Sequence, residues 1–186
     1  MKNDCIFCLV GPSGSGKSTV ARELPLESIK CYTTREPRVG EFDGDEKYFI
    51  SEEEFLNIYD QMIAHTKYSN HFYGITQGEL FGLEDGPLVY VVDLKGAETL
   101  KKVLPHLVGY EDVKVITIFL EVPKESLEMR MIAQGRSDEE IKTRLHRYKI
   151  DNKQRSECDY VVQNNYGQLE DTLDKINKII DFNVKI

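Results

Sequence analysis

One glycine-rich segment carries the strongest chemical signal in this sequence. Residues 11–18 read Gly-Pro-Ser-Gly-Ser-Gly-Lys-Ser, which satisfies the phosphate-loop pattern G-x-x-x-x-G-K-[S/T] in full. Glycines let several backbone N–H groups aim at one point, and the N-terminus of a following helix adds partial positive charge. In this pattern Lys17 reaches the β- and γ-phosphates, and the Ser18 hydroxyl coordinates Mg²⁺. The segment therefore predicts a site for ATP or GTP.

The alternative for this segment is a chance glycine-rich turn. The surrounding sequence disfavours it, because an apolar run at 4–10 and helix-forming residues at 17–24 supply the strand and helix that the motif requires. The motif does not define a reaction, since ATPases, GTPases and small-molecule kinases share it.

A second segment could bind an anion. Residues 33–41 read Thr-Thr-Arg-Glu-Pro-Arg-Val-Gly-Glu, with Arg35 and Arg38 on either side of Pro37. Proline stiffens the backbone, and the planar guanidinium group donates paired hydrogen bonds to phosphate. Taken alone, the segment fits a solvated charged loop equally well.

Composition limits the class of protein. The chain has 186 residues, a net charge of −8 and 40% hydrophobic residues, which fits one well-buried domain. An acidic chain is a poor candidate for nucleic-acid binding, which needs clustered positive charge. No apolar run approaches the ~20 residues that span a bilayer, and the N-terminus does not resemble a signal peptide. We expect a soluble, cytoplasmic protein without membrane contact.

Four cysteines are too few and too scattered for a disulfide framework. Cys5 and Cys8 form a C-x-x-C pair, which could indicate a redox or zinc site. A buried strand is the favoured interpretation, because residues three apart on a strand point to opposite faces.

Strand and helix patterns alternate along the chain. Buried strands are expected at 4–10, 88–93 and 113–121, further strands at 29–34 and 159–163, and short strands around a turn at 66–76. Helices are expected at 52–65 with a capping box at Ser51 and Glu54, at 95–104 before Pro105, at 124–134, at 138–150 with a capping box at Ser137 and Glu140, and around 169–180. This alternation predicts an α/β fold with a mostly parallel sheet flanked by helices.

Further motifs follow these segments in order. They are Phe72-Tyr73-Gly74, the strand end Val-Val-Asp-Leu-Lys-Gly-Ala at 91–97, Arg130, Arg144-Leu145 and residues 159–164. Together with TTREPRVGEFDG at 33–44, the chain resembles the guanylate kinase family over nearly its whole length. The resemblance implies a P-loop NTPase fold in one domain, 1–186. The implied parts are a core (1–30, 88–122 and 154–186), a nucleoside monophosphate (NMP)-binding insertion (31–87) and a helical lid (123–153).

The resemblance also implies roles for individual residues. Lys17, Arg130 and Arg144 would be catalytic, offsetting charge on the transferring phosphoryl group. ATP would be bound by Gly11, Pro12, Ser13, Gly14, Ser15, Gly16, Lys17, Ser18, Thr19 and Asn164, with Ser18 on the Mg²⁺ cofactor. The acceptor would be bound by Arg35, Arg38, Glu41, Lys47, Tyr73 and Asp93.

The sequence departs from the family where the base should be read. Guanine presents N1–H and N2–H donors and an O6 acceptor, and the family meets them with Glu and Ser side chains. The corresponding positions are Ala64, nine residues before Tyr73, together with Ile75 and Cys31. Such losses should weaken guanine selectivity, because a site built around hydrogen bonds discriminates by ~10⁴-fold. Thr76 is a further candidate for the base pocket.

Other departures concern phosphate and metal. Lys47 stands where the family has a phosphate-binding Tyr, and Val91 stands where it has a strand acid. In the lid, Gln134 replaces an arginine. Whether Arg136, two residues later, takes its place is open.

The leading interpretation is an NMP kinase that converts ATP and GMP (or dGMP) to ADP and GDP, as a monomer or homodimer. One alternative is a kinase of the same fold acting on another base or another phosphorylated small molecule. The second is a non-catalytic guanylate kinase-like binding module, which the intact phosphate loop disfavours.

Overall fold

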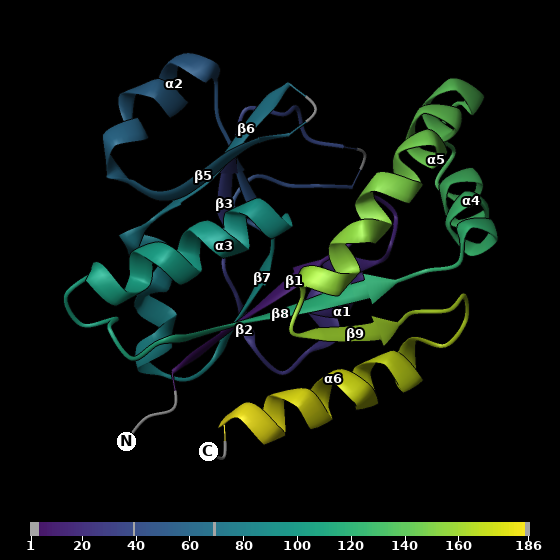
Figure 1. Ribbon diagram of the computed structural model, residues 1–186. Helices are drawn as coiled ribbons and strands as arrows, with labels where there is room; N and C mark the ends of the chain where they lie inside the picture. Colours follow the sequence, from purple (N-terminus) through teal and green to yellow (C-terminus); the bar gives the residue numbers. More distant parts are fainter. Residues whose placement is uncertain (1–3, 39, 69, 185–186) are drawn as a thin grey trace.

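The computed structural model describes residues 4–38, 40–68 and 70–184. Two β-sheets organise these residues, one at the centre of the molecule and a smaller one beside it (Figure 1). Helices α4 (Lys124–Ala133) and α5 (Asp138–Lys153) form a pair to the right of the smaller sheet in the view of Figure 1. The Arg147 guanidinium of α5 lies 5.0 Å from the centre of the Tyr68 ring, at the end of a strand of the smaller sheet.

The central sheet is parallel throughout, in the order β2-β7-β1-β8-β9. Its strands are β1 (Cys5–Val10), β2 (Glu27–Ser28), β7 (Leu88–Val91), β8 (Lys114–Glu121) and β9 (Tyr160–Gln163). β1 lies in the middle and is fully buried, as its run of apolar residues predicts. The expected α/β fold with a parallel sheet is confirmed.

Helices cover both faces of this sheet. Alternate side chains of β1 enter different cores: Ile6 and Cys8 pack against α3 (Leu94–Val103), whereas Cys5 and Phe7 pack against α1 (Lys17–Glu23) and α6 (Leu169–Val184). Cys5 and Cys8 therefore point to opposite faces, as expected from their spacing.

The smaller sheet has the order β4-β3-β6-β5 and mixes parallel and antiparallel pairs. Its strands are β3 (Cys31–Thr33), β4 (Lys47–Phe49), β5 (Met62–Tyr68) and β6 (His71–Thr76), followed by the 3₁₀ helix η2 (Gln77–Glu84). The strand expected at 29–34 is present only as the shorter β3. The two-residue strand β2, which precedes the predicted range, belongs to the central sheet, so the chain crosses between the two sheets here.

The helix expected at 52–65 is wrong in its second half. Helix α2 (Glu52–Asn57) has the expected capping box at Ser51 and Glu54, but a 3₁₀ turn η1 (Tyr59–Gln61) follows, and then β5 begins. Residues 62–68 pair with β6 in an antiparallel ladder. That ladder outweighs the helix-like spacing of Met62 and Ile63, because short apolar runs are ambiguous in period.

The lid segment forms α4 (Lys124–Ala133) and α5 (Asp138–Lys153), with the 3₁₀ turn η4 (Gln154–Glu157) after them. These helices share a small core of their own around Leu127, Met131 and Ile141. Ser137 caps α5 by accepting a hydrogen bond from the Glu140 amide at 3.3 Å, but the expected capping box is only half formed. The Glu140 carboxylate binds two arginines instead.

Helix α3 ends at Val103, and Pro105 lies in a 3₁₀ turn, η3 (Leu104–His106). Among the described residues, no helix has the length and apolar character needed to cross a membrane.

Candidate active site

The phosphate loop connects β1 to α1 and depends on glycine at two close approaches. Gly11 has φ +147°, and a Cβ there would lie 2.9 Å from the Leu120 carbonyl oxygen. Gly16 has φ +91°, and its Cβ would lie 2.8 Å from Asn164 Nδ2. Side chains at either position would therefore meet neighbouring atoms and strain the backbone. The first turn of α1 carries Ser18 and the exposed Thr19.

Lys17 lies at the end of the phosphate loop, and its side chain folds back toward the first residues of that loop. Its ammonium group donates hydrogen bonds to the carbonyl oxygens of Gly11 at 2.8 Å and Pro12 at 3.0 Å. Burial lowers the pKa of Lys17 to about 8. The negative charge of Asp151 raises this pKa, while Lys47, Arg38 and Arg144 lower it. Cations from three separate segments thus act on one ammonium group.

The side chains of Arg130 and Asn164 donate hydrogen bonds to the backbone of the phosphate loop. The Arg130 guanidinium donates to the carbonyl oxygens of Ser15 at 2.9 Å and Asn164 at 2.8 Å. The Asn164 amide donates to the same Ser15 carbonyl at 2.7 Å, and its oxygen accepts from Thr172 at 3.1 Å. These bonds hold the loop's backbone. Whether Arg130 also acts on the phosphoryl group stays a prediction.

The surroundings of Ser18 suit a hard cation. Burial alone would raise the pKa of Glu46, but hydrogen bonds from Arg22 and Ser18 lower it, so the carboxylate is charged beside the Ser18 hydroxyl. Both groups line a cavity of about 100 Å³ together with Asp45. Arg22 and Lys47 line the same cavity and pair with Glu46. The fit to the predicted Mg²⁺ therefore rests on the Ser18 hydroxyl, an oxygen ligand of the kind that Mg²⁺ prefers.

The segment that carries Arg35 and Arg38, called the arginine loop below, is ordered by one carboxylate, that of Glu41. Glu41 accepts two hydrogen bonds from Arg35 NH2, at 3.0 and 2.8 Å, and a third from the Arg38 amide at 2.8 Å. The Arg38 guanidinium has no such hydrogen bond to any described residue. Partial burial and the charges of Arg35, Arg136 and Arg144 lower the pKa of Arg38. Arg35 is therefore engaged, whereas Arg38 is available to an anion.

The other predicted acceptor residues lie on neighbouring strands. Tyr73 of β6 pairs with Thr33 of β3. Lys47 is the first residue of β4, which pairs with the other edge of β3 in the same sheet. Asp93 caps α3 by accepting from the Gly96 amide at 2.7 Å, and it also accepts from the Thr66 hydroxyl at 3.1 Å. Each carboxylate oxygen of Asp93 thus already accepts one hydrogen bond from the protein itself.

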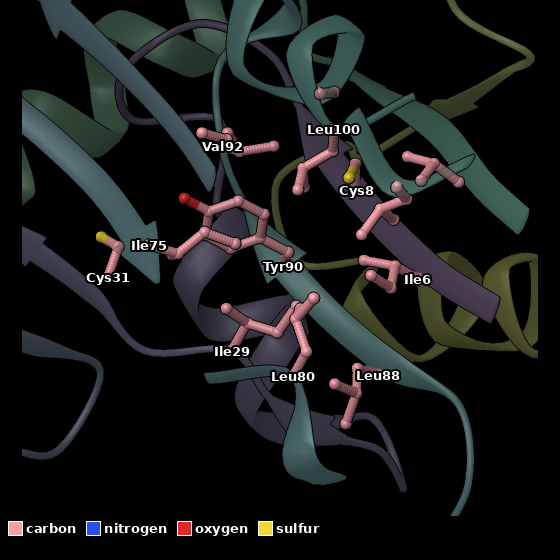
Figure 2. Close-up of a cluster of buried hydrophobic side chains, with 14 of the residues drawn as sticks. Ile6, Cys8, Ile29, Cys31, Ile75, Leu80, Leu88, Tyr90, Val92 and Leu100 are labelled. Carbon is pink, nitrogen blue, oxygen red and sulfur yellow. The ribbon is translucent and has the colours of Figure 1, made fainter. Parts of the chain in front are cut away.

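The predicted base-pocket residues lie in an apolar core. Cys31, Ala64 and Ile75 are only 4%, 3% and 0% exposed and belong to one hydrophobic cluster. In Figure 2 the Tyr90 ring lies beside Ile75, with its hydroxyl on the side of Cys31. Thr76 binds the Glu79 carboxylate and caps η2. The three altered positions therefore offer no polar group to a base.

A larger cavity, of about 410 Å³, lies between the phosphate loop and α5. It is lined by Pro12, Ser13, Tyr68, Ser137, Glu139, Glu140, Thr143, Arg144, Arg147 and Asp151. Sequence reasoning found only Pro12, Ser13 and Arg144 among these. The spacing of Glu140, Arg144, Arg147 and Asp151 along one side of α5 is the signal that could have indicated the rest.

The arrangement defines a class of protein. A phosphate loop with a half-buried lysine, an arginine loop beside a second sheet and a basic helical lid form the two-site arrangement of a phosphate-loop kinase. Donor and acceptor phosphates would meet among cations from all three parts.

Comparison with known proteins agrees with this class. The guanylate kinase family model matches residues 4–183. The guanylate kinase of Buchnera aphidicola is 32% identical over 100% of this chain and 92% of that protein. The guanylate kinase of Rickettsia prowazekii is 34% identical, over 94% of this chain and 89% of that protein. A crystal structure of guanylate kinase from Anaplasma phagocytophilum shares the fold, with a TM-score of 0.74 and 24% identity over 98% of this chain and 87% of that one.

This chain belongs to the guanylate kinase family, and it is a nucleoside monophosphate kinase.

Proposed function

We propose that the protein transfers the γ-phosphoryl group of ATP to the phosphate of a nucleoside monophosphate, with GMP or dGMP as the first acceptors to test. The convergence of charge on Lys17 carries this proposal. Arg38 and Lys47 from the NMP-binding region and Arg144 from the lid all act electrostatically on the ammonium group of the phosphate loop. Asp151 offsets part of this positive charge, and the remainder suits a site that binds the phosphates of two substrates.

The proposed transfer needs positioning and charge more than covalent help from the protein. An oxygen of the acceptor phosphate attacks the γ-phosphorus, the bond to the β–γ bridging oxygen breaks, and its electron pair leaves with ADP. Arg38 would hold the acceptor phosphate, while Lys17 and Arg144 would offset charge on the phosphoryl group. When bound with ATP, Mg²⁺ would lie at Ser18 and neutralise phosphate charge.

The proposal assigns movable parts to the fold. Residues 31–87 would bind the acceptor and residues 123–153 would close over the donor, around a core of 1–30, 88–122 and 154–186. Closure would exclude water from the reacting phosphates. A kinase of nucleotide pools would work in the cytoplasm.

The test is an acceptor panel. ATP–Mg²⁺ is incubated with ribo- and deoxynucleoside monophosphates of each base, and ADP formation is followed. A kcat/KM for GMP or dGMP at least about ten-fold above the other bases supports the proposed acceptor. Absence of transfer to every nucleotide contradicts the proposed function.

One observation favours a second candidate, a kinase of the same fold with a different acceptor. Cys31, Ala64 and Ile75 are packed into the core and cannot accept from the N1–H and N2–H donors of guanine. A buried donor left without a partner costs about 1–3 kcal/mol. Preference for another base, or for a phosphorylated compound without a base, in an extended panel would support this candidate.

The arginine loop gives a specific prediction. Replacing Glu41 by glutamine removes the charge that holds Arg35 and the Arg38 amide, so we expect the KM for the acceptor to rise about ten-fold with little change for ATP. Steady-state kinetics with each substrate varied measures this. Glu36→Gln is the matched control, because that exposed side chain lies in the same loop and only its backbone carbonyl binds Arg35. Equal effects of both variants would contradict the ordering role of Glu41.

A further inference from the structure

Arg136 lies in the turn between the two lid helices, and that turn is tightly held. The Gly135 amide donates to the Ile132 carbonyl at 2.9 Å, and the Arg136 amide donates to the Met131 carbonyl at 3.2 Å. Gly135 has φ +68°, the left-handed conformation that commonly ends a helix. The backbone from which the Arg136 side chain projects is therefore well defined.

The Arg136 side chain is directed inward and held at two points. Its exposed fraction is only 11%. Its Nε donates to the Gln134 side-chain oxygen at 2.9 Å, and one terminal nitrogen donates to Glu140 Oε1 at 3.0 Å. A guanidinium group has five N–H donors, and the others make no hydrogen bond to the described part of the chain.

Glu140 joins Arg136 to Arg144. The same oxygen, Oε1, accepts from Arg144 Nε at 3.1 Å, so one carboxylate carries two guanidinium groups. This is why Glu140 does not complete the capping box of α5. Glu140 and Arg144 both line the large cavity beside the phosphate loop. Arg136 is thereby tied to the wall of the site where the donor phosphates would lie.

The cluster carries more positive charge than its carboxylate balances. The positive charge of Arg136 also acts electrostatically on Arg38 of the arginine loop. The pKa of Arg38 is lowered by burial and by the charges of Arg35, Arg136 and Arg144. Two guanidinium groups of the lid thus share the Glu140 carboxylate, and both act electrostatically on Arg38 of the arginine loop. Unbalanced, inward-facing arginines of this kind are suited to bind phosphate.

We propose that Arg136 is a catalytic residue of the lid, which contacts the phosphoryl group during transfer together with Arg144, and that Glu140 positions both guanidinium groups. The inference rests on the proposed kinase function and names a residue for it. Because Arg136 shares Glu140 with Arg144, and Arg144 lines the cavity beside the phosphate loop, Arg136 would act on phosphate rather than on either nucleoside. Its charge would matter most when negative charge spreads over the transferring group.

The test is Arg136→Gln, studied by steady-state kinetics with ATP and with the best acceptor of the panel. We expect kcat to fall about 30- to 100-fold while KM for ATP changes less than about three-fold, because an interaction made mainly in the transition state lowers kcat. Lys142→Gln is the control: it removes one positive charge from an exposed position of the neighbouring helix α5 and should leave kcat unchanged.

A rescue variant separates chemistry from folding. Gln134 already contacts Arg136 Nε, so an arginine at 134 can bring its guanidinium to the same place. We expect Gln134→Arg combined with Arg136→Gln to recover at least about ten-fold of the lost kcat. If Arg136→Gln keeps kcat within about three-fold of the unmodified protein, the proposal is overturned. A loss of kcat that follows a lowered Tm and that Gln134→Arg does not recover also overturns it.

A binding measurement separates this inference from the kinase function on which it rests. MgADP with aluminium fluoride mimics the transferring phosphoryl group without turnover, and its affinity can be measured by titration calorimetry. We expect Arg136→Gln to weaken it at least about ten-fold and to leave MgADP alone unchanged. No transfer by the unmodified protein would reject the proposed function, whereas equal affinity of both proteins for the fluoride complex would reject the role of Arg136.

Discussion

Replacing Lys17 by methionine is expected to reduce phosphoryl transfer by at least about 10³-fold, with the fold retained. Lys17 is the cation at the centre of the site: its ammonium lies against the Gly11 and Pro12 carbonyls and is influenced by Arg38, Lys47 and Arg144. Methionine keeps the length and apolar contacts of the chain but cannot bind phosphate. Single-turnover measurement of ADP formation tests this. Lys102→Met, on the exposed side of α3, is the matched control and should be fully active.

The same variant has a predictable pH dependence of stability. The pKa of Lys17 is lowered to about 8 in the folded protein, against 10.5 for the ordinary side chain. Between these values the unfolded chain binds more protons than the folded one, so the free energy of unfolding rises with pH. Relative to Lys17→Met, the unmodified protein should gain up to about 1.4 kcal/mol per pH unit above pH 8. Urea titrations from pH 7 to 9.5 measure this, and a difference that stays flat or falls would show that the ammonium is not desolvated.

Replacing Arg38 by alanine is expected to raise the KM for the acceptor about 10²-fold or more, for every base in the panel. Glu41 occupies Arg35 and orders the loop, whereas the Arg38 guanidinium has no hydrogen bond to any described residue. A charge-assisted contact to phosphate contributes about 1.5–3 kcal/mol, and more when the phosphate is enclosed. The effect is independent of the base because phosphate is common to all the acceptors.

Arg155→Ala removes an exposed arginine that pairs with Glu121 away from the loop and should change neither KM. Titration calorimetry with MgATP should give the same dissociation constant for Arg38→Ala and the unmodified protein, within about two-fold. Weakened ATP binding with unchanged acceptor binding would reverse the assignment of the two sites.

The expectations that the structure confirms rest on residues close together in the sequence. The phosphate loop is contiguous, and its glycines and the following helix are determined within residues 11–23. The capping box at Ser51 and Glu54 spans four residues and forms as expected. The alternation of buried strands and helices, read from apolar periodicity, likewise predicted the parallel sheet.

The expectations that failed depend on distant partners. Residues 62–65 have helical spacing, but pairing with β6 makes them a strand, which places Ala64 opposite Ile75. At Ser137 the local capping signal is real, yet Glu140 binds Arg136 and Arg144 instead of completing the box. In each case an interaction made only after folding exceeds a local preference worth about 1 kcal/mol or less.

By itself the sequence determined the family, the phosphate loop, the arginine loop and the alternation of strands and helices around the central sheet, because each is encoded in local pattern. Only the tertiary structure decided how these parts act on one another. It joined Arg130 to Ser15 across 115 residues, set Asp151 and Arg144 near Lys17, and buried the three altered base-pocket positions in one core. The physical reason is that burial, charge coupling and strand pairing depend on which distant segments pack together, and that packing is a property of the whole folded chain.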